Sequence, residues 1–278
     1  MKKKIFLITG SSLRHKALIS LMELSNSFQI VGIIAEANLA LKEHVEQSSE
    51  NLEMAKHISK RDKYEEKFFS WANLYSEKLL NIYFKEKGWS STPECLKLID
   101  ELEPDLIVVY GSSILKGLVV SKYKNRIINL HLGLSPYYRG SGTNFFPFVN
   151  GELEYYGASF LLLNEGIDTG FIIHQIRPKI ISYDYYYFSH QFLLQSFITY
   201  INLIDNFDLL DLNIKQPKID SSNVLKVYKR KDFTEKSVQD MKKNLSNGLI
   251  KDYLLNKEIL NHKVQIVEQP NLLNNPEN

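Results

Sequence analysis

The chain alternates short apolar runs with longer helical patterns, and this alternation limits its fold more than any other feature. Residues 4–9 are apolar and β-rich, residues 10–12 (Gly-Ser-Ser) interrupt them, and a helical pattern over 13–24 precedes a second apolar run over 28–35. A strand, a helix and a strand in this order indicate a parallel sheet with helices on its faces. The uninterrupted run LIVVY at 106–110 is typical of a strand buried on both faces. The sequence therefore predicts an α/β fold: a Rossmann-like, mostly parallel sheet with flanking helices.

Later segments add strands and a helix to this sheet. Residues 126–131 form a further apolar run. Residues 157–164 and 170–175 predict an antiparallel pair of strands on either side of a loop. A helix is expected over about 187–206, because aromatic and aliphatic residues recur there on one face.

One long stretch does not fit the alternation. Residues 36–103 are mostly charged and helical, and their aromatic and basic part is longer than a strand crossover requires. We therefore expect a helical insertion at about 36–75. Its charged face is either a solvated surface or a lid over a substrate.

The pattern weakens near the C-terminus. We expect a domain over 1–212 and a small C-terminal extension over 213–278, with a helix over 233–245 that Thr234 caps. The polar tail 268–278 predicts disorder.

Composition excludes several classes of protein. The 34 Lys and Arg residues against 32 Asp and Glu residues give a net charge of only +2, which argues against a nucleic-acid binder that acts through broad charge. The single cysteine, Cys95, excludes an internal disulfide and a cysteine-based zinc cluster, and we expect it in the core. No apolar run is long enough to span a membrane. We expect a cytoplasmic protein without a metal.

Polar side chains follow two of the predicted strands. Asn129 and His131 end the strand in the segment INLHLGLSPYYRGSG (128–142), and Asp168 lies in the glycine-flanked loop NEGIDTG (164–170). Ligands bind beyond the carboxyl ends of the strands of an open parallel sheet, and alternate residues of a strand face the same side. An amide and an imidazole can stabilise an oxyanion while a carboxylate moves protons. A histidine at a strand end alone is more often structural, but the three groups on shaped loops suit acyl-group chemistry.

Three segments together resemble a known family. NLHLGLSPYYRG (129–140) followed by GIDTG (166–170), and PDLIVVYGSSIL (104–115), resemble the formyltransferases that use 10-formyltetrahydrofolate. That family includes methionyl-tRNA formyltransferase, glycinamide ribonucleotide transformylase and the sugar N-formyltransferases. The resemblance covers roughly residues 5–200, and the loop GLSP (133–136) departs from the usual family pattern although its proline is in place.

The resemblance implies a catalytic triad of Asn129, His131 and Asp168. A neutral amine attacks the formyl carbon, and Asn129 and a protonated His131 stabilise the oxyanion. Asp168 takes the proton of the amine and holds the histidine. The resemblance also implies a pocket for 10-formyltetrahydrofolate, lined largely by backbone groups; the expected contacts are Tyr110, Gly111, Ser112, Ser113, Ile114, Leu115, Gly166 and Ile167.

The contacts to the amine substrate are less constrained by the sequence. The candidates are Arg14, His15, Ser135, Tyr137, Arg139 and Gly140. Arg14 and His15 follow the first strand at the start of a helix, where anions bind, so they either meet a substrate phosphate or serve surface and capping roles. Arg139 either contacts the substrate or braces its loop. The aromatic segment 182–190 either stacks on a base or sugar or belongs to the core or a dimer contact.

Three acceptors remain open within the family, and a folate-binding relative that kept only the fold is the non-enzymatic alternative. Transfer-RNA enzymes carry an OB-like C-terminal domain, whereas the 65 residues after position 213 lack a run of short alternating strands. The purine enzymes have a histidine on the strand before the aspartate loop, where this chain has GASFLLLN (157–164). The closest fit is a sugar N-formyltransferase acting on a nucleotide-linked amino sugar for surface polysaccharides such as lipopolysaccharide. We expect no nucleic-acid or membrane partner, and a homodimer is an option.

Overall fold

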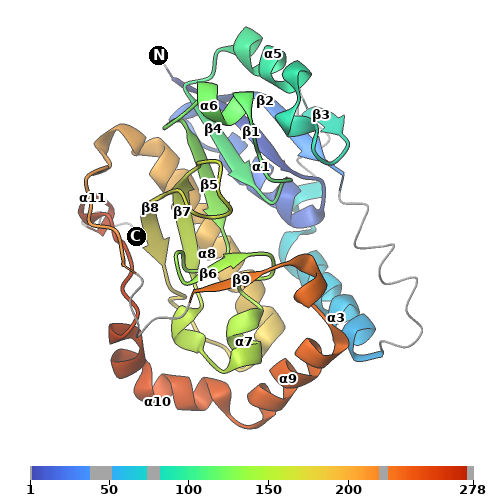
Figure 1. Ribbon diagram of the computed structural model, residues 1–278. Helices are drawn as coiled ribbons and strands as arrows, with labels where there is room; N and C mark the ends of the chain where they lie inside the picture. The colour runs from blue at the N-terminus through green and yellow to red at the C-terminus, as the bar shows by residue number, and fades with distance from the viewer. Residues whose placement is uncertain (1, 38–51, 74–81, 219–224, 274–278) are drawn as a thin grey trace.

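The computed structural model describes residues 2–37, 52–73, 82–218 and 225–273. Within these residues, seven strands form one sheet in the order β3-β2-β1-β4-β5-β7-β8 (Figure 1). All neighbouring strands are parallel except at β5–β7 and β7–β8. The mostly parallel α/β sheet and its antiparallel pair are confirmed. The strands are β1 (Lys3–Gly10), β2 (Phe28–Glu36), β3 (Ile82–Lys85), β4 (Leu106–Tyr110), β5 (Ile127–His131), β7 (Ala158–Leu162) and β8 (Phe171–Ile176).

Helices cover both faces of this sheet. One apolar cluster joins the sheet to α1 and α8, and a second joins the opposite face to α5 and α6. None of the described helices is long and apolar enough to cross a membrane. The helices are α1 (Leu13–Glu23), α3 (Leu52–Phe69), α5 (Pro93–Leu102), α6 (Leu118–Lys122), α7 (Phe146–Asn150), α8 (Tyr185–Asp205), α9 (Glu235–Ser246), α10 (Leu249–His262) and α11 (Pro270–Leu273), with 3₁₀ turns η1 (Trp89–Ser91), η2 (Leu153–Tyr155), η3 (Phe207–Leu209) and η4 (Arg230–Asp232).

The central strands are apolar throughout because each of their two faces meets a helical layer. In β1, Ile5 and Leu7 belong to the first cluster, whereas Phe6 and Ile8 belong to the second. Successive side chains of a strand point to opposite faces, so a strand covered on both sides needs no polar positions. Cys95 packs in the second cluster and is buried, as expected, and burial raises the pKa of its thiol to about 12.

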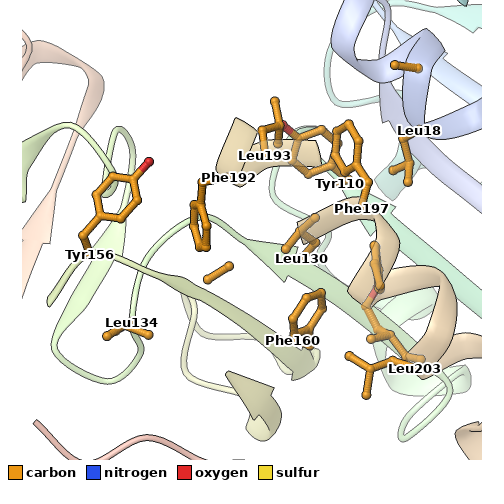
Figure 2. Packing of buried hydrophobic residues seen from close by; sticks show 14 of the residues in the cluster. Leu18, Tyr110, Leu130, Leu134, Tyr156, Phe160, Phe192, Leu193, Phe197 and Leu203 are labelled. Atoms are coloured by element: carbon orange, nitrogen blue, oxygen red, sulfur yellow. The ribbon is translucent and has the colours of Figure 1, made fainter. Parts of the chain in front are cut away.

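Helix α8 packs across the strands that carry the candidate site. Figure 2 shows Phe192 and Phe197 of the helix beside Leu130 and Phe160 of the sheet. Burying one such side chain stabilises a fold by about 1.5–3 kcal/mol. This contact therefore fixes the helix against the sheet near the carboxyl ends of its central strands.

A buried tyrosine of α8 joins β4 to β5. The Tyr200 hydroxyl donates to the carbonyl of Ile128 at 2.6 Å and accepts from the amide of Val109 at 3.2 Å. Val109 comes directly before Tyr110, and Ile128 comes directly before Asn129; Tyr110 and Asn129 are both predicted site residues. Tyr200 therefore ties α8 to the ends of these two strands, which also pair directly with each other.

The stretch between β2 and β4 differs from the sequence prediction. The sequence analysis missed β3, which pairs in parallel with β2. Helix α3 therefore lies in the crossover that two parallel strands require. The helix confirms the helical character of part of the expected insertion at 36–75, and residues 38–51 and 74–75 of that segment lie outside the described residues.

The C-terminal extension forms a separate two-stranded sheet with an earlier segment. Its strand β9 (Lys226–Tyr228) pairs in parallel with β6 (Tyr138–Gly140), which follows β5 (Figure 1). Thr234 caps helix α9, because its side chain accepts from the amide of Ser237, so this predicted cap is confirmed. The boundary between 1–212 and 213–278 stays a prediction.

The prediction of a disordered tail is wrong for residues 268–273. Gln269 is fully buried, and its side-chain amide donates to the carbonyl of Ile173 in the edge strand β8. Its backbone amide donates to Nδ1 of the buried His174, also in β8. The tail is ordered because it covers polar groups of an edge strand, which a polar composition does not reveal. Residues 274–278 lie outside the described part of the chain.

Candidate active site

Asn129 and His131 lie at the carboxyl end of β5 and both line one cleft of about 790 Å³. The residue between them, Leu130, also borders the cleft, but its side chain packs in the first apolar cluster. The alternation of a strand thus separates the polar pair from the apolar residue, as the sequence predicts. Asp168, from the loop between β7 and β8, lines the same cleft.

His131 lies between two acceptors. Its Nδ1 is 3.4 Å from Oδ2 of Asp168, and its Nε2 is 2.9 Å from the carbonyl oxygen of Tyr138. The ring is buried. Asp168 and the β6 backbone therefore fix the orientation of the ring, because each of its two nitrogens lies beside one acceptor.

Asp168 is held in an uncommon backbone conformation. Its φ is +50°, in the left-handed region that aspartate tolerates better than most residues. Its Oδ2 accepts from the amide of Gly140 at 2.8 Å, and its carbonyl accepts from the Ser135 hydroxyl at 3.3 Å. The carboxylate therefore has a fixed position relative to His131.

Asn164 organises the loop that carries Asp168, and the sequence analysis missed it. Its Oδ1 accepts from the amide of Gly166 at 3.0 Å and from the Thr169 hydroxyl at 2.7 Å. An asparagine that bonds the backbone two residues ahead is a common turn device. Its place directly before a glycine-containing loop is the signal that could have indicated this role.

The side-chain amide of Asn129 has no hydrogen-bond partner among the described residues, although it lines the cleft. A half-buried amide in a cleft forms its hydrogen bonds with a ligand or water. Asn129 is therefore available to donate to a carbonyl oxygen bound beside His131.

Residues 110–115, here called the folate loop because the sequence analysis predicts folate contacts there, line the cleft next to the end of β4. Glu36, at the end of β2, holds this loop from behind. Its carboxylate accepts from the amide and hydroxyl of Ser113 at 2.7 and 2.9 Å, and from the amide and hydroxyl of Ser90 at 3.2 and 2.5 Å. Glu36 is only 2% exposed, so its four donors replace water. The sequence analysis missed it because nothing local links these three residues.

Two isoleucines give the cleft apolar surface. Ile114 in the folate loop is 51% exposed and Ile167 beside Asp168 is 45% exposed, and both line the cleft. Exposed aliphatic side chains inside a cleft are typical of a ligand site. Every predicted folate contact lines the cleft; these are Tyr110, Gly111, Ser112, Ser113, Ile114, Leu115, Gly166 and Ile167.

The predicted substrate contacts divide into two groups. Arg14, His15 and Gly140 line the cleft, whereas Ser135, Tyr137 and Arg139 are not among the residues that line it. The Tyr137 ring is fully buried and its hydroxyl donates to the carbonyl of Gln265, away from the cleft.

Arg14 and His15 also have partners within the chain. Arg14 pairs with Glu65 of α3 at 2.5 Å. Burial acts against both charges, but each offsets the other, so that the pKa of Arg14 is raised and the pKa of Glu65 is lowered. His15 is buried against Gly10 and Gly111 with its Nδ1 2.7 Å from the Ser12 hydroxyl, and burial lowers its pKa well below the usual value. A phosphate contact by either side chain stays a prediction.

The structure adds lining residues that the sequence analysis did not select. Helix α3 contributes Arg61 and Glu65, and the start of α8 contributes Tyr185, Tyr186, Ser189 and His190 from the aromatic segment. The C-terminal extension contributes Tyr228, Lys229 and Arg230. These elements are far apart in sequence, so no local motif joins them.

Comparisons with known proteins identify the family of the chain. The family model described as "Formyl transferase" matches residues 2–187. The chain is 31% identical over 190 residues to the methionyl-tRNA formyltransferase of Finegoldia magna, an alignment that covers 64% of this chain and 60% of that protein. The chain thus spans about 60% of the length of this relative. A second methionyl-tRNA formyltransferase, from Chlorobium chlorochromatii, is 34% identical over 36% of this chain and 32% of its own.

Solved structures show the same fold at low identity. The phosphoribosylglycinamide formyltransferase of Anaplasma phagocytophilum superimposes with a TM-score of 0.52 at 14% identity, over 83% of this chain and all of that one. The Brucella melitensis enzyme of the same name gives 0.52 at 18% identity, over 74% of this chain and 96% of that one. With the family model matching most of the chain and the three polar groups assembled in one cleft, the chain belongs to the formyl transferase family.

Proposed function

We propose that this protein is an N-formyltransferase that moves the formyl group of 10-formyltetrahydrofolate to a primary amine of a nucleotide-linked amino sugar, in the synthesis of a surface polysaccharide. The observation that carries the formyl transfer is one cleft with three features. These are the available amide of Asn129, the His131–Asp168 pair, and the folate loop with its backbone hydrogen-bonding groups and the exposed Ile114.

The chain's own groups have distinct tasks in this reaction. As the bond from the amine nitrogen to the formyl carbon forms, negative charge develops on the formyl oxygen, and the Asn129 amide donates to it beside the positive His131 ring. Asp168 accepts the proton that the amine loses. A carboxylate has about four acceptor positions, so Gly140 and His131 leave room for that proton. The proton then goes to the folate nitrogen whose bond to the formyl carbon breaks.

The residues present fit a folate. The exposed Ile114 and Ile167 offer apolar contact to a flat ring, and the folate loop is held rigidly by Glu36. A cleft of about 790 Å³ lies in the size range of sites for small molecules and cofactors. In the described part of the chain, no three His, Cys, Asp or Glu side chains are arranged to hold a metal ion.

The identity of the acceptor is inferred from the residues that line the cleft on the side of the C-terminal extension. The extension lines the cleft with Tyr228, Lys229 and Arg230, and α3 lines it with Arg61. These residues limit the space beside the triad and make it cationic. Such a site favours a small, anionic acceptor.

Methionyl-tRNA is the second candidate acceptor. The observation that favours it is the 31% identity to a methionyl-tRNA formyltransferase over 190 residues. A folate-binding relative without activity is the third option, and the assembled Asn129, His131 and Asp168 argue against it.

The test is a formylation screen. The protein is incubated with 10-formyltetrahydrofolate and dTDP-, UDP- or GDP-linked amino sugars, and separately with methionyl-tRNA over a salt series. Mass spectrometry detects the gain of one formyl group, and Asp168→Asn is the inactive control. We expect turnover of an amino-sugar nucleotide that changes little with salt. Strongly salt-dependent formylation of methionyl-tRNA alone would instead select the transfer-RNA acceptor, because binding to nucleic acid releases counterions.

A further inference from the structure

The cleft carries more positive charge than the chain as a whole. Five of its described lining residues are Lys or Arg and two are Asp or Glu, whereas the complete chain has 34 against 32. The cations are Arg14, Arg61, Lys87, Lys229 and Arg230, and the carboxylates are Glu65 and Asp168. A concave site lined by one sign of charge attracts ligands of the opposite sign.

Some of these cations are already paired. Arg14 pairs with Glu65 at 2.5 Å, and Arg61 pairs with Asp62 at 2.8 Å. Lys229 and Arg230 are exposed and form no ion pair with any described residue. They are therefore available to an anionic ligand.

Lys87 is also exposed and without an ion pair in the described residues, but it belongs to the folate side of the cleft. It precedes η1, whose Ser91 hydroxyl accepts from the amide of Lys116 at 3.0 Å, next to the folate loop. Lys229 and Arg230 come from a different element, because they follow β9 in the C-terminal extension.

Strand β9 holds this basic pair next to the triad. The carbonyl of Tyr228 accepts from the amide of Ser141 at 2.9 Å. A Cβ at Gly140 would lie 2.0 Å from that same carbonyl oxygen, and Gly140 has a φ of +93°, so only glycine fits there. The amide of Gly140 in turn donates to Asp168 at 2.8 Å. The backbone before Lys229 is thus linked to the carboxylate of Asp168 through two adjacent residues, Ser141 and Gly140.

The turn that carries the pair is rigid although its charged ends are exposed. The amide of Lys229 donates to Asp232 at 2.7 Å. On either side, Tyr228 stacks on Phe146 at a centroid distance of 3.7 Å, and Phe233 packs on Phe145 at 5.1 Å. A fixed backbone lowers the entropy that is lost when the side chains bind a ligand.

We propose that Lys229 and Arg230 bind the phosphate group of the acceptor substrate and so determine which amines the enzyme formylates. The inference rests on the proposed function in taking the acceptor to be a phosphate-bearing amine. The guanidinium of arginine forms paired hydrogen bonds with phosphate oxygens, and the lysine ammonium adds a point charge. The C-terminal extension would then be part of the acceptor site.

The test measures binding directly, apart from turnover. UDP, dTDP, GDP and inorganic pyrophosphate are titrated by calorimetry into the wild type, Arg230→Ala and the double variant Lys229→Ala/Arg230→Ala. The matched control is Lys231→Ala, which removes the same charge from the neighbouring exposed residue that does not line the cleft. We expect the double variant to bind the preferred diphosphate at least about tenfold more weakly, since each lost bond to a charged group weakens binding severalfold or more. Lys231→Ala should bind the diphosphate as tightly as the wild type does. All variants should keep the wild-type affinity for 5-formyltetrahydrofolate.

Three results would overturn the phosphate site: wild-type binding of both diphosphate and methionyl-tRNA by the double variant, an equal loss in Lys231→Ala, or a loss of folate affinity instead. A parallel titration with methionyl-tRNA separates the two sources of phosphate. If the double variant loses only transfer-RNA binding beyond the Lys231→Ala control, the phosphate site stands and the amino-sugar acceptor of the proposed function falls.

Discussion

The two sides of the cleft are held in place by different physical means. The folate loop is positioned by a buried carboxylate, Glu36, through four hydrogen bonds from Ser90 and Ser113. The opposite side, here called the acceptor wall, consists of Arg61, Tyr186 and residues 228–230.

The acceptor wall is backed by an aromatic cluster around a buried histidine. His57 of α3 packs on Phe145, Tyr185 and Phe233 at centroid distances of 5.4 to 5.8 Å, and its Nδ1 is 3.0 Å from the Tyr186 hydroxyl. Hydrogen bonds to a carboxylate are directional, whereas apolar contacts tolerate small shifts. Under the proposed function, we therefore expect the folate side to hold its ligand in one pose and the acceptor wall to tolerate more change.

Asp168→Asn should give the largest effect because the triad serves both sides. The amide cannot accept a proton from the amine and does not balance the His131 charge. We expect kcat to fall by about 100–1000-fold. The measurement is single-turnover formylation of the accepted amine. Folding is checked by circular dichroism and by binding of 5-formyltetrahydrofolate, and near-normal turnover by a folded variant would remove Asp168 from the proton transfer.

Glu36→Gln should affect the folate side alone. The glutamine amide replaces an acceptor oxygen with a donor, which leaves buried N–H or O–H groups of Ser90 or Ser113 unpaired at about 1–3 kcal/mol. We expect KM for 10-formyltetrahydrofolate to rise about tenfold or more, with KM for the acceptor unchanged. Glu86→Gln, at an exposed position, is the matched control. Equal rises in both KM values would mean that the two sides are not held independently.

The pH dependence of folding stability should report on His57, which lies behind the acceptor wall. Burial, and then the positive charges of Arg61 and Lys242, lower the pKa of His57 to about 3. The unfolded chain takes up this proton near pH 6.5 and the folded protein does not, so stability falls as the pH drops below 6.5 towards 3. The loss attributable to His57 is about 2 kcal/mol at pH 5 relative to pH 8.

The measurement compares urea unfolding of the wild type and His57→Asn across this range. Other buried histidines such as His174 also titrate, so the difference between the two proteins is the relevant quantity. We expect the variant to lose less stability on acidification. Parallel pH profiles would contradict a neutral His57 in the folded state.

The smallest effect is expected at Ser112. Its hydroxyl bonds only the carbonyl of the next residue, whereas the Ser113 hydroxyl bonds Glu36. If folate binding depends on the loop backbone, Ser112→Ala should change the folate KM by less than about twofold. Ser113→Ala should change it more, because it removes a hydrogen-bond donor from the buried carboxylate of Glu36. The sequence resemblance alone predicts little effect at both positions. A larger effect at Ser112 would show that its side chain binds the folate.

The sequence by itself determined the central strands of the sheet and the placement of Asn129 and His131 at the end of β5. The apolar runs of β1, β4 and β5 require helices on both faces, and the period of two in a strand places Asn129 and His131 together while Leu130 enters the core. The glycines around Asp168 indicated a shaped loop. These are consequences of local backbone geometry, and a strand imposes them wherever it forms.

Only the tertiary structure decided what surrounds the triad. It turned Tyr137 away from the cleft, placed Glu36 behind Ser113, a residue 77 positions later, and paired β9 with β6 across more than 80 residues. It also ordered the polar tail by giving Gln269 three backbone partners in β8 and near η3. Hydrogen bonds and strand pairs at such separations depend on how whole layers pack, so no local pattern of residues encodes them.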